Sequence, residues 1–98
     1  MPYAILFEDA PGTAEKRLAH RDAHLDYMRS HLPKILASGG LLNDSGTAGE
    51  GGVILMDFDT RAEAEAFVEG DPFYREGIYG SWQIRRWRKA FFDGQDCL

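Results

Sequence analysis

The chain has 98 residues, of which 44% are hydrophobic and 28% charged, a balance typical of one folded globular domain. Its formal net charge of −5 argues against a nucleic-acid-binding protein, because such proteins neutralise phosphates with Lys and Arg. No apolar run approaches the roughly 20 residues of a membrane span, and the single Cys97 cannot form an internal disulfide. We therefore expect a single cytoplasmic domain with neither nucleic acid nor membrane as a partner.

The first half of the chain predicts one strand followed by a long helix. Tyr3–Asp9 is a compact apolar run that ends at a Pro-Gly turn signal, which indicates a strand. Thr13 is a candidate N-cap for the helix that follows. Helical character is expected to continue to Gly39 or Gly40, which would take the left-handed position after the helix. Pro33 is expected to kink this helix or divide it into two pieces.

The second half is expected to supply three more strands and one more helix. Thr60 is followed three positions later by Glu63, which is the capping-box pattern of a helix start, and Gly70 would end that helix. Residues 44–52 are rich in glycine and are expected to form a flexible hairpin connection. The three strands are expected at residues 39–44, 52–58 and 81–89. Residues 3–90 would form the ordered core, with residues 91–98 as a C-terminal tail.

This order of elements predicts an α+β, ferredoxin-like β-α-β-β-α-β fold with a four-stranded antiparallel sheet and both helices on one face. Alternate residues of a strand point to opposite faces of the sheet, and here both faces receive apolar side chains. In the first strand, one face receives Tyr3, Ile5 and Phe7 and the other receives Ala4 and Leu6. In the third strand, one face receives Ile54, Met56 and Phe58 and the other receives Val53 and Leu55. Two helices can cover only one face. We therefore expect a homodimer that packs sheet to sheet.

Three histidines, His20, His24 and His31, fall within roughly 40° of one another on an ideal helix. The pair His20 and His24 has the i,i+4 spacing of a metal chelate, although no Glu follows His20 to complete a HExxH motif. The favoured alternative is that these are polar residues beside the core stripe, which is expected to contain Leu18, Leu25, Met28, Leu32 and Leu36. His24 would then lie at the edge of the stripe, with one side buried and the other facing a cavity.

Asp71 stands between the helix-ending Gly70 and Pro72, and the proline favours extended geometry at Asp71. Asp-Pro is common at turns, where the carboxylate can accept a hydrogen bond from a nearby backbone N–H. On the residues alone, this structural role is the more common one.

The stretches "RDAHLDYM", "GGLL", "GVILMDFDTRAEAEAFVEGDPFYREGIY" and "IRRW" together resemble the YciI-like family of small ferredoxin-fold proteins. The resemblance extends from Tyr3 to about Phe92. It implies a dimer with a pocket between helices and sheet, and a His–Asp pair that falls on His24 and Asp71. It also implies HCl elimination from chlorinated, hydroxylated aromatic compounds.

The residues and the resemblance together predict a cofactor-independent lyase or isomerase that acts on a small, oxygenated, ring-shaped molecule. His24 would be the general base and Asp71 would orient it, so that neither a metal nor a cofactor is required. Phe7 and Arg17 are the predicted substrate-binding residues. Further candidates for the pocket wall are Phe73, Tyr74 and Tyr79, and Arg21 is the alternative to Arg17 for holding an anionic or phenolic oxygen. The alternatives are a non-catalytic module that binds a small ligand in the same pocket and, more remotely, a metal-dependent ring oxygenase.

Overall fold

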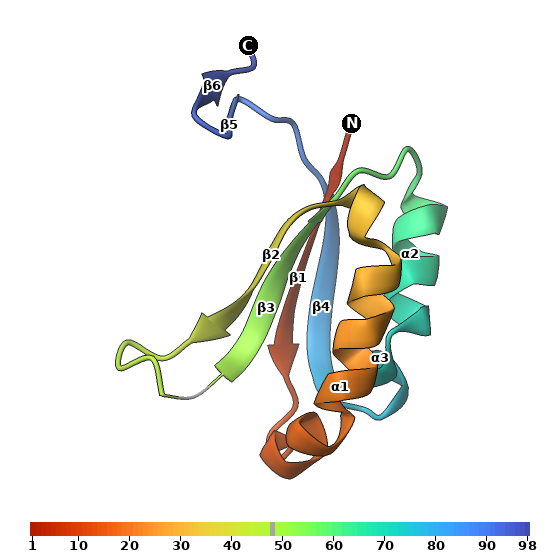
Figure 1. The fold of residues 1–98 in the computed structure, drawn as a ribbon, viewed down its shortest axis with the longest axis vertical. Coiled ribbons are helices and arrows are strands. Elements are labelled where there is room, and N and C mark those ends of the chain that lie inside the picture. The colour runs from red at the N-terminus through yellow and green to blue at the C-terminus, as the bar shows by residue number, and fades with distance from the viewer. Residues whose placement is uncertain (48) are drawn as a thin grey trace.

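The computed structural model describes residues 1–47 and 49–98, and it shows a four-stranded antiparallel sheet with helices on one face (Figure 1). The strand order is β2-β3-β1-β4. The elements of the sheet layer and its helices are β1 (Tyr3–Asp9), α1 (Ala14–Ser30), the 3-10 turn η1 (Leu32–Lys34), β2 (Ile35–Leu42), β3 (Gly49–Met56), α2 (Arg61–Gly70), α3 (Pro72–Arg75) and β4 (Tyr79–Arg86). The predicted α+β class and split β-α-β-β-α-β order are confirmed. Among the described residues, no helix combines the length and apolar character needed to cross a membrane.

The core lies between the helices and the inner face of the sheet. β1 occupies the bounds predicted from its apolar run, and Tyr3, Ile5 and Phe7 are only 4%, 1% and 6% exposed on its inner face. Ile54 and Met56 of β3 lie opposite Ile5 and Tyr3 in register and are equally buried. β1 is hydrogen-bonded to a strand on each side. The alternation of its side chains between the two faces therefore also determines which side chains of β3 and β4 face the helices.

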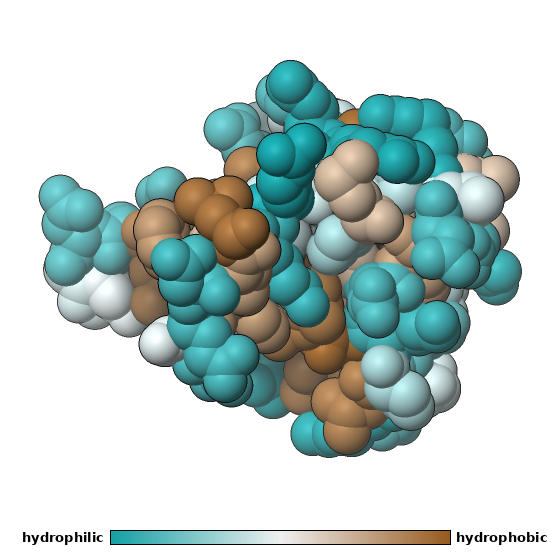
Figure 2. Space-filling model, turned by 90° about the horizontal axis from the view of Figure 1, so that it is seen from above, coloured by the Kyte–Doolittle hydropathy of each residue, from teal (hydrophilic) through white to brown (hydrophobic). Residues whose placement is uncertain are grey.

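The outer face of the sheet, which points away from the helices, also carries apolar side chains. By the strand register these are Ala4, Leu6, Leu41, Val53 and Leu55. Leu6 and Leu41 are 40% and 43% exposed, which is high for large apolar residues in a sheet. Viewed from above, the molecule shows a band of brown apolar side chains crossing its surface between teal polar regions (Figure 2).

The first helix ends earlier than predicted. α1 stops at Ser30, Pro33 lies in the 3-10 turn η1, and β2 begins at Ile35. The expectation that helix would continue to Gly39 or Gly40 is therefore wrong, and both glycines lie inside β2. Proline has no N–H for a helical hydrogen bond and disfavours helix in the residue before it, so it ends the helix rather than kinking it. Thr13 precedes α1, but its hydroxyl donates to the carbonyl of Ala10 instead of capping the helix.

The predicted apolar stripe of α1 is confirmed at Met28 and wrong at its leucines. Leu18 and Leu32 are 76% and 63% exposed, and of the α1 residues only Met28 is fully buried. The helix presents instead the stripe that contains His24, Tyr27, Met28 and His31, roughly a quarter turn away at about 100° per residue. Part of the expected core stripe consequently faces an open groove.

The predicted capping box at the start of α2 is confirmed. The Thr60 hydroxyl accepts from the backbone N–H of Glu63, and the Glu63 carboxylate accepts from the N–H of Thr60. Gly70 is the last residue of α2, as predicted. The short helix α3 was not predicted, although its signals are present: Asp71 caps it and Pro72 takes its first position.

The remaining corrections concern the β2–β3 connection and the C-terminus. β3 begins at Gly49, earlier than expected, and Ala48 of the predicted flexible loop lies outside the described residues. The predicted tail forms a small hairpin of β5 (Phe91–Phe92) and β6 (Gln95–Asp96). Its turn is Asp93-Gly94, both with positive φ, which is the strongest short sequence signal for a hairpin.

Candidate active site

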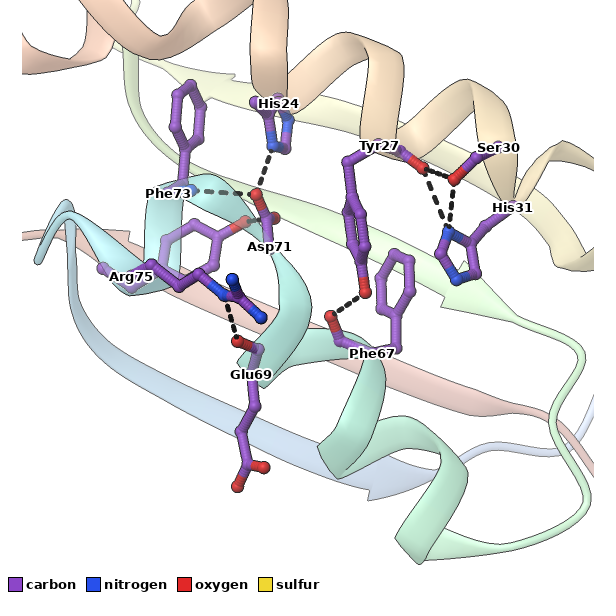
Figure 3. Close-up of polar contacts among 10 residues, drawn as sticks. His24, Tyr27, Ser30, His31, Phe67, Glu69, Asp71, Phe73 and Arg75 are labelled. Atoms are coloured by element: carbon purple, nitrogen blue, oxygen red, sulfur yellow. Dashed lines mark hydrogen bonds and ion pairs between the residues drawn. The ribbon is translucent and has the colours of Figure 1, made fainter.

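Two residues 47 positions apart meet between α1 and the α2–α3 junction. His24 Nδ1 lies 2.8 Å from Asp71 Oδ1 (Figure 3). The His24 side chain is 13% exposed and that of Asp71 only 1%. A carboxylate can only accept, so Nδ1 carries the proton of this hydrogen bond and the neutral ring keeps its lone pair on Nε2. Nε2 makes no hydrogen bond to any residue that the structure describes.

The Asp71 carboxylate is held by two further donors. The backbone N–H of Phe73 donates to Oδ1 at 2.9 Å (Figure 3). The hydroxyl of Tyr79 donates to Oδ2. Asp71 is extended, with φ −70° and ψ 129°, as predicted for a residue before proline. The structural and the functional interpretations of Asp71 therefore describe the same carboxylate: it caps α3 and contacts the imidazole. Three donors fix its position in a site that water does not reach.

Tyr79 is buried beside this carboxylate. Burial first, and the negative charge of Asp71 second, raise the pKa of the Tyr79 hydroxyl far above its ordinary value. Tyr79 therefore remains a hydrogen-bond donor to Asp71 throughout the physiological pH range. Its ring also packs against Phe7, with ring centroids 4.1 Å apart.

Phe73 packs against both the imidazole of His24 and the guanidinium of Arg17. The ring of His24 stacks on Phe73 with centroids 3.9 Å apart and planes inclined by 3°. The Arg17 guanidinium lies over Phe73, 4.8 Å from the ring centroid, while its Nε donates to Asp9 Oδ2 at 2.8 Å. Arg17 thus has a fixed position about two helical turns from His24, with its terminal nitrogens uncommitted to Asp9.

A cavity of about 190 Å³ lies beside His24, between α1 and the β2–β3 hairpin. The predicted substrate-binding residues Phe7 and Arg17 both line it, as does Arg21. Its floor on β2 and β3 includes three glycines, Gly39, Gly40 and Gly51, which contribute no side chains. The remaining lining residues are Leu25, Met28, Ser38 and Ile54.

The cavity adjoins a wider groove of about 640 Å³ towards the start of α1, and Arg17 and Arg21 line both. Leu18 belongs to the groove and Leu25 to the cavity, which explains why these members of the expected core stripe are not buried in the core. Asp9 lines the groove too, and its buried Oδ1 has no hydrogen-bond partner among the described residues.

The other predicted site residues have different surroundings. Phe73 is fully buried under His24, and Tyr74 packs on Trp82 instead of lining the cavity. His20 and His24, the candidate metal chelate, have different partners. His20 Nε2 lies 3.6 Å from Glu76 Oε2, whereas His24 binds Asp71. No group of three His, Cys, Asp or Glu residues suited to a metal ion occurs within residues 1–47 and 49–98.

Two features of the site were missed. Tyr79 was expected only as a wall residue, and its hydrogen bond to Asp71 was not foreseen because the Gly77 turn brings it back beside α3. The glycine floor was taken as strand and loop. Gly40 lies opposite Gly52 in register, and this pairing of glycines across two strands was the available signal of a bare surface.

The fold and these contacts define a ferredoxin-like α+β domain with a buried imidazole–carboxylate pair beside a cavity, and the comparisons agree with this class. The profile of the YCII-related domain matches residues 1–88. Protein YciI of Escherichia coli is 30% identical over 98 residues, covering 93% of this chain and 100% of the relative. A Haemophilus influenzae protein is 28% identical over 102 residues with the same coverage. The chain belongs to the YCII-related family.

One similar structure carries a functional name. It is the 5-chloro-2-hydroxyhydroquinone dehydrochlorinase TftG of Burkholderia phenoliruptrix, in complex with 2,5-dihydroxybenzoquinone. The two structures superpose with a TM-score of 0.83 at 30% sequence identity, covering 90% of this chain and 94% of TftG. A protein of Agrobacterium tumefaciens, Atu4242, shares the fold with a TM-score of 0.54 at 20% identity.

Proposed function

We propose that this chain is a cofactor-independent enzyme of the lyase or isomerase type, with His24 as general base and Asp71 as the residue that orients it. The observation that carries the proposal is the 2.8 Å bond between His24 Nδ1 and a buried carboxylate, on a ring that also lines a cavity. This bond assigns the basic lone pair to Nε2. Such a base accelerates a proton transfer by about 10²–10⁴-fold.

The proposed substrate is a single oxygenated ring. A cavity of about 150 Å³ holds one benzene ring, so the space of about 190 Å³ beside His24 suits one six-membered ring with small substituents. Arg17 and Arg21 line the same space and are suited to bind a phenolic or quinonoid oxygen. The dehydrochlorinase name and the dihydroxybenzoquinone ligand of TftG support the same substrate class.

The proposed reaction is the elimination of HCl from a chlorinated, hydroxylated ring. In the keto tautomer of such a ring, the carbon that bears chlorine also bears a hydrogen. Nε2 of His24 removes a proton from a ring hydroxyl, whose oxygen forms a C=O bond, and the neighbouring ring double bond shifts to the carbon that bears chlorine. The C–Cl bond breaks and chloride leaves with its electron pair. Asp71 stabilises the imidazolium that forms, as a carboxylate does in a catalytic triad. His24 then returns the proton to solvent, so the net change is loss of HCl and no redox partner is involved.

We also propose that two chains pair through the outer faces of their sheets. Ala4, Leu6, Leu41, Val53 and Leu55 form an apolar surface there that no helix covers. A second copy would bury this surface symmetrically. Analytical ultracentrifugation at micromolar concentration should find a dimer, and a monomer would contradict this part of the proposal.

The direct test is to incubate the protein with 5-chloro-2-hydroxyhydroquinone and to measure chloride release beside ligand binding. The expected result is release of chloride with formation of a quinone product, above the rate without protein. Saturable binding without chloride release would instead identify a non-catalytic binding module. Failure of any oxygenated ring to bind would contradict both.

Two glycine variants test whether the ring occupies the proposed cavity. A side chain at Gly40 would project from the inner face, and its Cβ would lie no closer than 3.8 Å to any neighbour, so Gly40→Val should fold and fill the floor. Gly39 lines the cavity only through its backbone, and its side chain would project from the outer face, with nothing within 4 Å of Cβ. Gly39→Val is therefore the matched control, with its oligomeric state measured as well because the outer face is the proposed dimer surface. Binding should be lost in the first variant and kept in the second. Equal binding by both would place the ligand elsewhere.

A further inference from the structure

The last nine residues, 90–98, form a hairpin that stands apart from the rest of the molecule, and we call this segment the C-terminal arm. Figure 1 shows it beyond the end of the sheet and on the side away from α1 and α2. Phe91 pairs with Asp96 and Phe92 with Gln95, and the N–H of Cys97 donates to the Ala90 carbonyl at 2.7 Å. The arm lies beyond residues 1–88, which the family profile matches.

The arm has little support from its own chain. Within the described part of the chain, every hydrogen bond of the arm joins two arm residues. Its contacts with the preceding segment are the ring of Phe92 on Trp87, at 6.2 Å between centroids, and Lys89 over Phe92. A hairpin with two residues in each strand is not stable alone in water. A further surface is therefore needed to hold the arm in this conformation.

The chemistry of the arm indicates what that surface must offer. Phe91 is 70% exposed and Leu98 82% exposed, and both extend from the same small hairpin. Asp93 and Asp96 add negative charge. The complementary surface is apolar with positive charge at its margin.

The outer face of the sheet has this character. Ala4, Leu6, Leu41, Val53 and Leu55 make it apolar, and Arg85 shares the face, because it lies opposite Ala4 in register. The arm reaches the outer side of the sheet but does not lie on the face of its own chain (Figure 1). In a pair of chains related by a twofold axis, each arm can contact the outer face of the other chain, which makes two identical contacts.

We propose that the C-terminal arm of each chain packs against the outer sheet face of a second copy and clasps the dimer. The proposal rests on the sheet-face dimer proposed above, and adds that Phe91 and Leu98 of one chain are buried by the other. The arm is therefore a dimerisation element added to the family domain.

Truncation tests the proposal. A chain that ends at Lys89 should still fold, because the arm makes few contacts with the core, and its dimer dissociation constant should rise by about 100-fold or more as large apolar side chains leave the interface. The double variant Phe91→Ser/Leu98→Ser should reproduce most of this loss. The control is Leu32→Ser, which removes a leucine that is 63% exposed on η1, and its dissociation constant should not change.

The possible outcomes distinguish the role of the arm from the existence of the sheet-face dimer. A full-length dimer whose dissociation constant does not change on truncation would overturn the role of the arm and leave the sheet-face dimer standing. A full-length chain that is monomeric would overturn both.

The chain's single cysteine provides a second measurement on the native sequence. A benzophenone maleimide on Cys97 should cross-link, in a mixture of ¹⁵N-labelled and unlabelled protein, to peptides of the outer face of the other chain. Cross-links confined to the same chain would overturn the proposal.

Discussion

His24 on α1 and His31 at the C-cap of α1 lie about two helical turns apart, and their surroundings differ. Both rings pack on aromatic side chains: His24 on Phe73, and His31 against Tyr27 and Phe67. Both direct Nδ1 at an oxygen, but for His31 the partners are neutral: the backbone carbonyl of Tyr27 and the hydroxyl of Ser30, each at 3.0 Å (Figure 3). For His24 it is a buried carboxylate.

The comparison shows that the hydrogen-bond partner of Nδ1, rather than the position on the helix, determines whether a histidine is suited to act as a base. A neutral carbonyl fixes the orientation of the ring but adds no charge to stabilise an imidazolium. A carboxylate does both. In addition, His24 lines a cavity, whereas His31 is not among the residues around the three principal pockets of the described chain. We therefore expect the two histidines to respond very differently to the same changes.

The largest difference is expected when each histidine is replaced by glutamine. His24→Gln should lower the rate of chloride release by about 10²–10⁴-fold, because the base is lost while polar volume is kept. His31→Gln should leave the rate within about twofold of the wild type, because His31 does not line the cavity. Steady-state kinetics on both variants, with circular dichroism as the folding control, measures this. Equal losses would mean that His24 is a structural residue like His31.

The next difference concerns the carboxylate. Asp71→Asn replaces an acceptor by an amide whose nitrogen cannot accept from Tyr79 or His24, so the free energy of unfolding should fall by about 2–4 kcal/mol. Asp26→Asn is the matched control, since this exposed aspartate only approaches Arg29 at 3.5 Å, and its effect should be near zero. Urea unfolding provides both values. An Asp71 variant as stable as its control would show that the buried pair adds nothing to the fold.

The two tyrosines beside the histidines allow a smaller comparison. Tyr79→Phe leaves Asp71 Oδ2 without its donor and should cost about 1.5–3 kcal/mol, the range for a bond to a charged group. Tyr27→Phe removes a bond to the carbonyl of Phe67 at 2.8 Å and should cost about 0.5–1.5 kcal/mol. The first variant should also lower turnover, because Asp71 becomes less firmly placed. A reversed order of stability would contradict the difference in charge between the two acceptors.

The smallest effect is expected at alkaline pH. Burial and the charge of Asp71 raise the pKa of Tyr79 above its ordinary value of 10.0, so the folded state holds this proton more tightly than the unfolded state. The resulting stability is complete below pH 10 and is lost as the pH rises above it. The pKa of Tyr27 is raised for the same two reasons, with Arg75 opposing the shift. As the pH rises above 10, the melting temperature should therefore decline less steeply in Tyr79→Phe than in the wild type. Equal slopes of melting temperature against pH in the two proteins would contradict a link between the Tyr79 proton and stability.

Local patterns predicted the elements whose signals do not depend on distant contacts. The apolar run of β1 and the capping box of α2 are of this kind, and the DPF motif located Asp71. The face of α1 that packs on the sheet could not be predicted in the same way. Two stripes compete on this helix, and the sheet and α2 select the one with histidines and tyrosine, which leaves Leu18 exposed at 76%.

The cavity was harder to predict because it depends on residues that have no side chain. Gly40 and Gly51 lie on two strands, and only the register of β2 with β3 brings them together. The bond from Tyr79 to Asp71 likewise depends on the turn at Gly77, which returns β4 beneath α3. Both features require the tertiary structure, since neither the composition nor the spacing of the sequence specifies them.

The tautomer of His24 tests the central claim most directly. Nitrogen NMR of ¹⁵N-labelled protein, at a pH where the ring is neutral, reports which ring nitrogen carries the proton. A protonated Nδ1 and an unprotonated Nε2 are expected, with this pattern lost in Asp71→Asn. A proton on Nε2 in the wild type would mean that the ring has no lone pair to offer a substrate on that side, and His24 would not be the base.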